Sequence, residues 1–184
     1  LFFRDAYDPQ EFLDELNKVL VNNIETKKLL IKVSQVIEQN LKSQFCSFYI
    51  RDTAYFKNRL IGDFKTKISD EDTHEMQSYI ATMKKDVISV ESELLSDDEK
   101  KLVHLMKRYD VEVLLPLSNT LGKDTDNLGY LLIGAKRSGN LYDKNDLNIL
   151  GIIGNELSIA IENTLRYEEI EQFAVTLQQK VNDA

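Results

Sequence analysis

The sequence predicts an α+β domain: a central antiparallel sheet of about five or six strands, helices on both faces, and long N- and C-terminal helices. Two observations predict this class. Apolar residues recur at three- and four-residue spacing at both ends of the chain, which is typical of amphipathic helices. Between them, short apolar segments follow one another with only brief polar connections. Sequential strands of this kind favour antiparallel pairing, because a parallel pair needs a longer crossover.

Two helices are predicted at the N-terminal end. The first covers residues 9–22, with Asp8 as its N-cap and Pro9 in the first turn, where proline is tolerated. The pattern resumes at Thr26 and continues to Leu41. The apolar positions of the first helix are Phe12, Leu13, Leu16, Val19 and Leu20.

The middle of the chain alternates strands and helices. Residues 45–51 form a predicted strand, and residues 53–61 are its weaker candidate hairpin partner. Ser69 is a predicted N-cap, followed by acidic residues that the helix dipole favours, for a helix to about residue 84. Residues 86–90 form a short predicted strand.

The second half repeats this alternation. Ser96 and Glu99 have the spacing of a capping box for a helix ending near residue 109. Strands are predicted over 111–117 and 128–136, joined by a polar hairpin tip over 118–127. The second of these strands is apolar on both faces and is therefore predicted to be central. After a turn at 138–140, Asp143 caps a helix that runs to about residue 181.

Composition excludes several function classes. The chain has 184 residues, a net charge of −8 and a pI of about 4.9, which argues against a nucleic-acid groove. The single cysteine, Cys46, excludes an internal disulfide and a cysteine-based zinc site. No segment has the length of a membrane span or the pattern of a signal peptide. We expect a fragment of a longer protein, itself without membrane contact, in a reducing cytoplasmic setting; the parent chain can still be membrane-anchored.

The segment from Leu114 to Asn163 carries a connected pattern of motifs. An apolar strand ends in Pro-Leu, and a hairpin leads to a second apolar strand bounded by glycines. A basic turn, an aromatic residue, an aspartate and a helix follow. The residues of the pattern are Leu115-Pro116-Leu117, Gly129–Gly134, Lys136–Gly139, Tyr142, Asp146 and Ala160–Asn163. In this pattern the segment resembles the GAF domain family.

This resemblance implies a GAF-like, PAS-related sensory domain over residues 26–163. Residues 1–25 would then be a linker or dimerisation helix, and residues 164–184 a signalling helix that continues as a coiled coil. GAF-like domains place small molecules between the sheet and a variable segment, here roughly residues 62–109. The candidate pocket residues are Phe48, Ile50, Tyr55, Phe64, Ile88, Leu115, Tyr130 and Leu132, and an ordinary core role is the alternative for each.

Strand alternation places Cys46, Phe48 and Ile50 on one face and Ser47 and Tyr49 on the other. One face packs on the terminal helices and the other is free to face a pocket. The sequence leaves open which is which.

The flanking helices suggest the cytoplasmic sensor module of a bacterial sensor histidine kinase in a two-component system. In such a protein the exit helix leads to the helices that carry the phosphoacceptor histidine. His74 and His104 match no phosphoacceptor signature, so this fragment is not expected to be an enzyme. The parent chain would transfer phosphate from ATP to a histidine. The alternatives are another output, such as a nucleotide cyclase or a transcription regulator, or a structural dimerisation module that binds no ligand.

The C-terminal helix carries a pattern typical of a coiled coil, with apolar residues about every 3.5 positions. Asn163 is a polar exception in this series. We expect a parallel homodimer, which Phe12, Leu16 and Val19 would extend upstream; a frayed tail is the alternative. The predicted dimer positions are Tyr167, Ile170, Ala174, Leu177 and Val181, after Ala160 and Asn163 at the start of the series.

No cofactor, catalytic residue or metal ligand is evident, although a small-molecule ligand is expected from the resemblance. Cys46 is a candidate chromophore anchor, but a small buried apolar role is the favoured alternative. His74 and His104 are candidate haem ligands on charged helices, with a satisfied histidine as the alternative. Asp124 and Asp126 lie in the hairpin tip, where a solvated acidic loop is favoured over a cation site.

Overall fold

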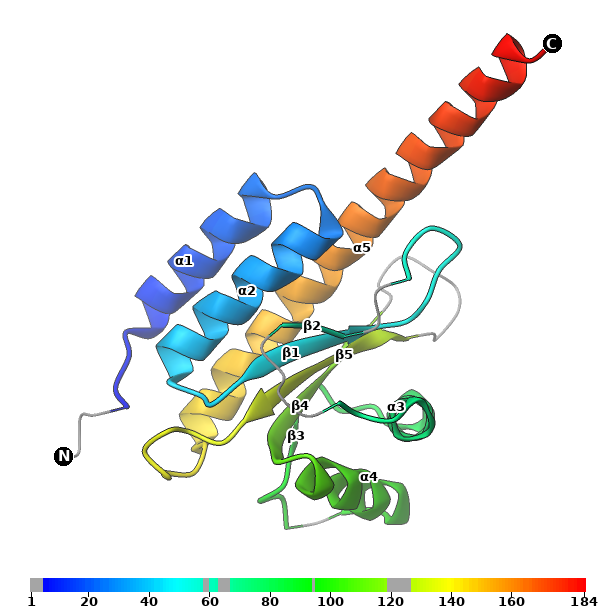
Figure 1. Cartoon of the computed structure of the whole chain (residues 1–184). Coiled ribbons are helices and arrows are strands. Elements are labelled where there is room, and N and C mark those ends of the chain that lie inside the picture. Colours follow the sequence, from blue (N-terminus) through cyan, green and yellow to red (C-terminus); the bar gives the residue numbers. More distant parts are fainter. Residues whose placement is uncertain (1–4, 58–59, 63–66, 94, 119–126) are drawn as a thin grey trace.

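The computed structural model describes residues 5–57, 60–62, 67–93, 95–118 and 127–184, so Phe64, Asp124 and Asp126 lie outside the described residues. Three helices cover one face of a five-stranded sheet and two helices cover the other, as predicted (Figure 1). The elements are α1 (Pro9–Asn22), α2 (Thr26–Leu41), β1 (Cys46–Ile50), β2 (Leu60–Gly62), α3 (Asp70–Thr82), β3 (Ile88–Ser89), α4 (Asp97–Arg108), β4 (Val111–Ser118), β5 (Asn127–Gly134) and α5 (Lys144–Asn182). No helix within these ranges is both long and apolar enough to cross a membrane.

The sheet has the strand order β2-β1-β5-β4-β3, and every neighbouring pair is antiparallel. Strand β5 lies at the centre, which confirms the prediction from its two apolar faces. Gly129 shows why the centre is tight: a Cβ atom there would lie 1.9 Å from the carbonyl oxygen of Tyr49, and its φ of +151° is rare for other residues. Of the described residues in the predicted partner of β1, 53–57 are not strand, and the strand β2 covers Leu60–Gly62.

The structure shows which face of the sheet meets the terminal helices. Cys46, Phe48 and Ile50 point into a core shared with α1, α2 and α5. Tyr49 points into a second core, shared with α3 and α4. Strand β5 contributes to both cores, which is why its sequence is apolar at successive positions.

Helix α1 belongs to the first core rather than standing apart from it. Asp8 caps the helix as predicted, accepting hydrogen bonds from the backbone N–H groups of its first turn. Phe12 and Leu16 are fully buried, and Val19 packs against the same core. The expectation that Phe12 and Leu16 extend a dimer bundle is therefore wrong, because their apolar surface is already covered within one chain. Val19 is only partly buried, and its predicted role in a dimer stays a prediction.

Two of the helix starts differ in how completely their capping boxes form. Ser96 accepts a hydrogen bond from the backbone of Glu99, but the Glu99 carboxylate binds Lys85 at 2.9 Å. At α5, by contrast, Asp143 and Asp146 form both reciprocal hydrogen bonds of a capping box. The start of α5 is thus fixed locally.

A buried ion pair fixes the start of α5 to the sheet as well. The Lys136 ammonium lies 2.8 Å from the carboxylate of Asp146, and both side chains are buried. The Tyr7 hydroxyl donates to the other carboxylate oxygen at 2.7 Å, which brings the N-terminal segment to the same place. Burial, followed by this hydrogen bond, raises the pKa of Tyr7, so the hydroxyl keeps its proton.

We expect Lys136→Met to lower the free energy of unfolding by about 3–5 kcal/mol, because it leaves the Asp146 charge buried without its cation. Urea denaturation measures this loss. Lys144→Met removes an exposed charge from the first turn of the same helix and serves as the matched control, with a change within about 0.5 kcal/mol. Equal, small losses in both variants would contradict a structural role for the ion pair.

Candidate functional site

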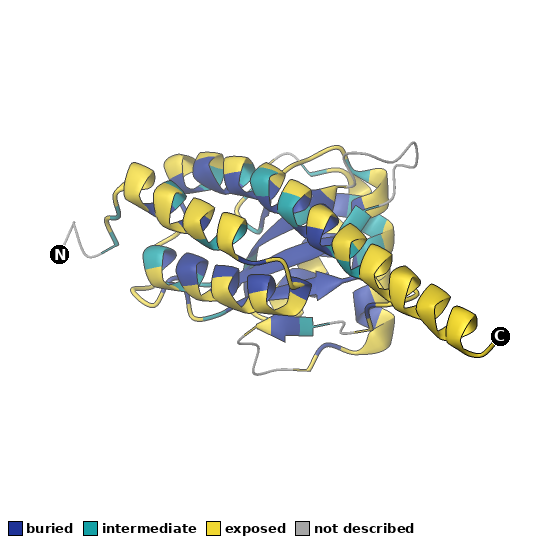
Figure 2. Cartoon of the chain, turned by 90° about the horizontal axis from the view of Figure 1, so that it is seen from above, coloured by how far each residue is buried: buried dark blue, intermediate teal, exposed yellow. Residues whose placement is uncertain are grey.

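Helix α5 has two different environments along its length. It contains 39 residues, which corresponds to about 58 Å at 1.5 Å per residue. Its first half is part of the core, where Ile149, Ile153 and Leu157 are buried against the sheet. Every residue from Glu169 onward is exposed, so about the last third of the helix projects beyond the domain (Figure 2). We call residues 169–182 the overhang.

The projecting part carries large apolar side chains in solvent. The predicted dimer positions Tyr167, Ile170, Ala174, Leu177 and Val181 are all exposed, and Val181 keeps 69% of its surface. Phe173 is exposed beside them, although it is not one of the predicted dimer positions. A large aromatic side chain is unusual at a solvent-facing position, and this is the sequence signal that could have added Phe173 to the exposed apolar surface.

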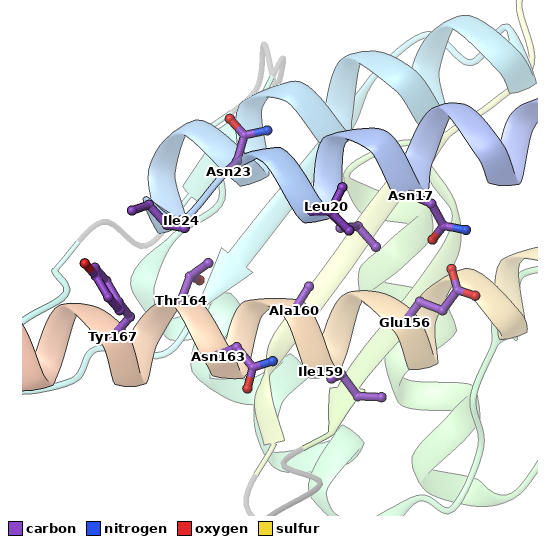
Figure 3. Close-up of a pocket in the computed structure, with 11 residues that line it drawn as sticks. Asn17, Leu20, Asn23, Ile24, Glu156, Ile159, Ala160, Asn163, Thr164 and Tyr167 are labelled. Atoms are coloured by element: carbon purple, nitrogen blue, oxygen red, sulfur yellow. The ribbon is translucent and has the colours of Figure 1, made fainter.

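A groove lies between the end of α1 and the middle of α5. Its volume is about 520 Å³, and it opens to solvent where α5 is about to leave the domain (Figure 3). Apolar side chains from both helices form its walls, with a few polar groups between them. The lining residues are Asn17, Leu20, Val21, Asn23, Ile24, Glu156, Ile159, Ala160, Asn163, Thr164 and Tyr167. We call this feature the exit groove.

The exit groove contains an unsatisfied polar atom. One carboxylate oxygen of Glu156, Oε2, is inaccessible to solvent and has no hydrogen-bond partner among the described residues. Such an atom is costly, because a buried acceptor without a donor loses its hydration and gains nothing in return.

A set of hydrogen bonds closes the domain at the point where α5 leaves it. The backbone N–H of Thr26 donates to a carboxylate oxygen of Glu168 at 2.7 Å. The Thr26 hydroxyl donates to the Thr164 hydroxyl at 2.9 Å, which in turn donates to the Ile161 carbonyl. The N-cap of α2, Glu25, makes no side-chain capping bond, so Glu168 supplies the cap from another helix. We call these contacts the exit clamp.

The eight predicted pocket residues do not form one site. Ile88, Tyr130 and Leu132 lie in the core beside α3 and α4. Three others, Phe48, Ile50 and Leu115, lie on the opposite face of the sheet, against the terminal helices. Tyr55 is half-exposed in a shallow hollow beside the exit part of α5. Phe64 lies outside the described residues.

On the α3 and α4 side, the described residues pack closely against the sheet. The Tyr49 and Tyr130 rings are stacked with their centroids 4.8 Å apart. The Tyr130 hydroxyl donates to the Thr73 carbonyl at 3.2 Å, and burial raises the pKa of this tyrosine. This face of the sheet is therefore joined to α3 by a buried hydrogen bond as well as by apolar contact.

Helices α3 and α4 are joined to each other through Asp72. Its carboxylate accepts a hydrogen bond from the Tyr109 hydroxyl and forms an ion pair with Arg108 at 3.1 Å. These two partners, the hydroxyl first, hold the pKa of Asp72 below its ordinary value. The pair of helices is thus held together at one end by a charged carboxylate.

The residues considered as cofactor ligands lie apart from one another. Cys46 is fully buried in the core against the terminal helices, and burial raises the pKa of its thiol, so it is a poor nucleophile. His74 and His104 lie on different helices, α3 and α4, and both are exposed.

Comparison with solved structures supports the GAF-like fold. The chromophore-binding domain of a bacteriophytochrome from Stigmatella aurantiaca matches 86% of this chain with a TM-score of 0.52 and 12% sequence identity. The chain spans 62% of the length of that protein. A far-red cyanobacteriochrome photoreceptor matches 84% of this chain and 96% of its own length, with a TM-score of 0.46 and 15% identity. No protein-family model and no curated protein matches the sequence significantly.

We expect Glu168→Ala to loosen the first turn of α2, because the N–H of Thr26 loses its acceptor. Loss of a helix cap costs about 0.5–2 kcal/mol, measured as a lower free energy of unfolding. Faster hydrogen exchange at the start of α2 should accompany it. Glu171→Ala, an exposed glutamate one turn further along α5, is the control. The role of Glu168 in the exit clamp would be refuted if the two variants had the same free energy of unfolding.

Proposed function

We propose that this chain is a sensory domain of a bacterial signal-transduction protein, which couples signal perception in its GAF-like domain to a dimeric output helix. The observation that carries this proposal is the continuity of α5. One uninterrupted helix packs on the sheet at its start and projects as an exposed rod at its end. A change in the domain can therefore move the rod without any intervening joint.

The contacts at the two ends of the buried half support coupling. At its start, α5 is tied to the sheet through Lys136 and Asp146. At its exit, it is tied to α2 through Thr164 and Glu168. A shift in the sheet or in α2 that changed either set of contacts would change the tilt or rotation of α5.

The exposed residues of the projecting part favour a parallel homodimer as the output state. The predicted positions recur at three- and four-residue spacing along one side of the helix: Tyr167, Ile170, Ala174, Leu177 and Val181. Fully burying an aliphatic side chain of this size is worth about 1.5–3 kcal/mol. Two such helices can adopt closely related packings, and a signal selects between them by its difference in affinity for the two states. A coupling of about 1–3 kcal/mol is enough for regulation.

The finer proposal is that the parent chain is a cytoplasmic sensor histidine kinase. In that arrangement the projecting helix would lead into the dimerisation helices that carry the phosphoacceptor histidine. The exposed, outward-running end of α5 is suited to this connection (Figure 1). This fragment would then regulate a kinase without catalysing the transfer itself. A parent chain with a nucleotide cyclase or a transcription regulator as its output would use the same projecting helix.

A second candidate function is a dimerisation module that binds no ligand. The specific observation in its favour is the close packing of Tyr49, Tyr130 and Leu132 against α3 and α4. Native mass spectrometry of the purified chain separates the two candidates. A bound small molecule that survives transfer and is released on unfolding supports a sensor, and a bare protein mass supports the structural module.

We expect single cysteines introduced from 169 to 181 to form disulfides between copies in a periodic pattern. The maxima should fall at Ile170, Ala174, Leu177 and Val181, because these positions face the partner about every 3.5 residues. Oxidation followed by non-reducing electrophoresis measures the yield at each position. The chain without an added cysteine is the control, since Cys46 is fully buried. A flat profile would contradict the parallel pair.

A further inference from the structure

The N-terminal segment contacts the start of α5 before it enters α1. We call residues 5–8 the strap. The Tyr7 hydroxyl donates a hydrogen bond to one carboxylate oxygen of Asp146 at 2.7 Å. The Tyr7 ring packs edge-on against the ring of Phe12 in α1, with 5.5 Å between the two centroids. The strap therefore joins the first turns of α1 and α5.

The strap is attached to the turn before α5 as well. One carboxylate oxygen of Asp5 accepts hydrogen bonds from the Ser138 hydroxyl and the Asn140 side-chain amide, each at 2.6 Å. These two donors, the hydroxyl first, lower the pKa of Asp5, so its carboxylate stays charged and remains a strong acceptor. The turn is closed by its own backbone, because the N–H of Gly139 donates to the Lys136 carbonyl at 3.0 Å. Asp5 thus holds a turn of defined shape.

We infer that the strap is an input to the output helix, so that a signal acting on the N-terminal segment reaches α5 without passing through the sheet. This inference rests on the proposed function, because it adds a second input to the same helix. In the docked state, Asp5 and Tyr7 hold the start of α5 in one orientation. In the undocked state the first turn of α5 loses these contacts, and the helix takes a different tilt on the same core.

Asp146 is the residue on which the strap acts. Its other carboxylate oxygen pairs with the Lys136 ammonium at 2.8 Å and accepts the backbone N–H of Asp143 at 2.9 Å. The Asp146 side chain is buried, so each donor compensates for hydration that the carboxylate has lost. Loss of the Tyr7 hydroxyl removes one of these donors, and the carboxylate turns to find another. Because this carboxylate is half of the capping box, its rotation alters the first turn of α5.

The strap can undock while α1 stays in place. Every residue of the strap is at least partly exposed. Hydrogen bonds attach it to the turn and to α5, and water replaces such bonds at a small net cost. Phe12 and Leu16, by contrast, are fully buried and hold α1 on the core. Undocking is therefore a local opening that leaves the rest of the domain folded.

The continuity of α5 carries the change from the strap to the exit clamp. Asp146 and Thr164 lie on the same uninterrupted helix, about 27 Å apart at 1.5 Å per residue. A helix transmits a tilt along its length, whereas a loop would absorb it. A tilt at Asp146 therefore displaces Glu168, whose carboxylate lies 2.7 Å from the backbone nitrogen of Thr26 in the closed clamp.

The test measures amide hydrogen exchange by NMR in the full 184-residue chain. Tyr7→Phe removes only the hydroxyl that binds Asp146. Tyr79→Phe is the matched control, because it also removes a tyrosine hydroxyl from a carboxylate, that of Glu75, but within α3. The exchange rate of the Thr26 amide, which the exit clamp protects, should rise about fivefold or more in Tyr7→Phe, the lower end of typical coupling. In Tyr79→Phe it should stay within about twofold.

A second variant and a second amide keep the test independent of general stability. Asp5→Ala releases the other end of the strap, and adding it to Tyr7→Phe should raise the Thr26 exchange rate further. The Leu131 amide lies in the central strand β5 and reports on opening of the whole sheet. Faster exchange at Thr26 with unchanged exchange at Leu131 supports the inference. Equal changes at both amides, or a change confined to the first turn of α5, overturn it.

The outcomes also separate this inference from the proposed function. If cysteines along the overhang give no periodic crosslinks but Thr26 responds to Tyr7→Phe, the dimeric output is overturned and the strap is supported. If the periodic crosslinks form and Thr26 does not respond, the strap is overturned and the dimeric output stands. Circular dichroism should show the same helix content in Tyr7→Phe as in the unaltered chain, since the substitution removes a single oxygen.

Discussion

Helix α5 has to be a core helix over about its first two thirds and a solvent-exposed rod over about its last third, with no break between them. The exit clamp marks the change of environment. Up to Thr164 and Glu168 the helix makes hydrogen bonds to the rest of the domain, and from Glu169 onward every residue is exposed. The rest of the structure depends on this constraint, because any movement of the domain that reaches the rod has to pass through these few residues.

Polar contacts, rather than apolar packing, are suited to fix the rotation of such a helix. Apolar packing is non-directional, whereas a hydrogen bond has a defined distance and angle. The buried half of α5 carries directional contacts at both ends, through Asp146 at the start and through Glu168 at the exit. Breaking either set would leave the helix packed on the sheet but free to change its angle. The proposed two-state output would require this combination of firm packing and a few replaceable contacts.

Much of the fold could be predicted because its signals are local. Asp8, Ser69 and Asp143 cap the helices they were expected to cap, since a capping side chain bonds its own first turn. The alternation in β1 correctly separated Phe48 from Tyr49, and the two apolar faces of β5 correctly predicted its central place.

The candidate site could be predicted only in part, because its contacts join residues distant in sequence. Glu168 accepts the hydrogen bond from the backbone N–H of Thr26 although it lies 142 positions away, and neither residue belongs to a sequence pattern that predicts the pairing. The predicted pocket set combined Phe48 with Tyr130, since a single sequence does not say which face of a sheet meets which helices. The apolar side chains of the overhang were predictable, because they recur periodically along the sequence. The exit groove was not, because it depends on the packing of α1 beside α5.

The most direct test of coupling is hydrogen exchange in the Leu177→Cys dimer, measured with the disulfide formed and again after its reduction. Coupling is reciprocal, so fixing the rod has to alter the domain as much as the domain alters the rod. The account predicts at least a fivefold change in exchange at the start of α2, where Thr26 meets Glu168, which corresponds to the lower end of typical allosteric coupling. Identical exchange rates throughout the domain in the two states would contradict it.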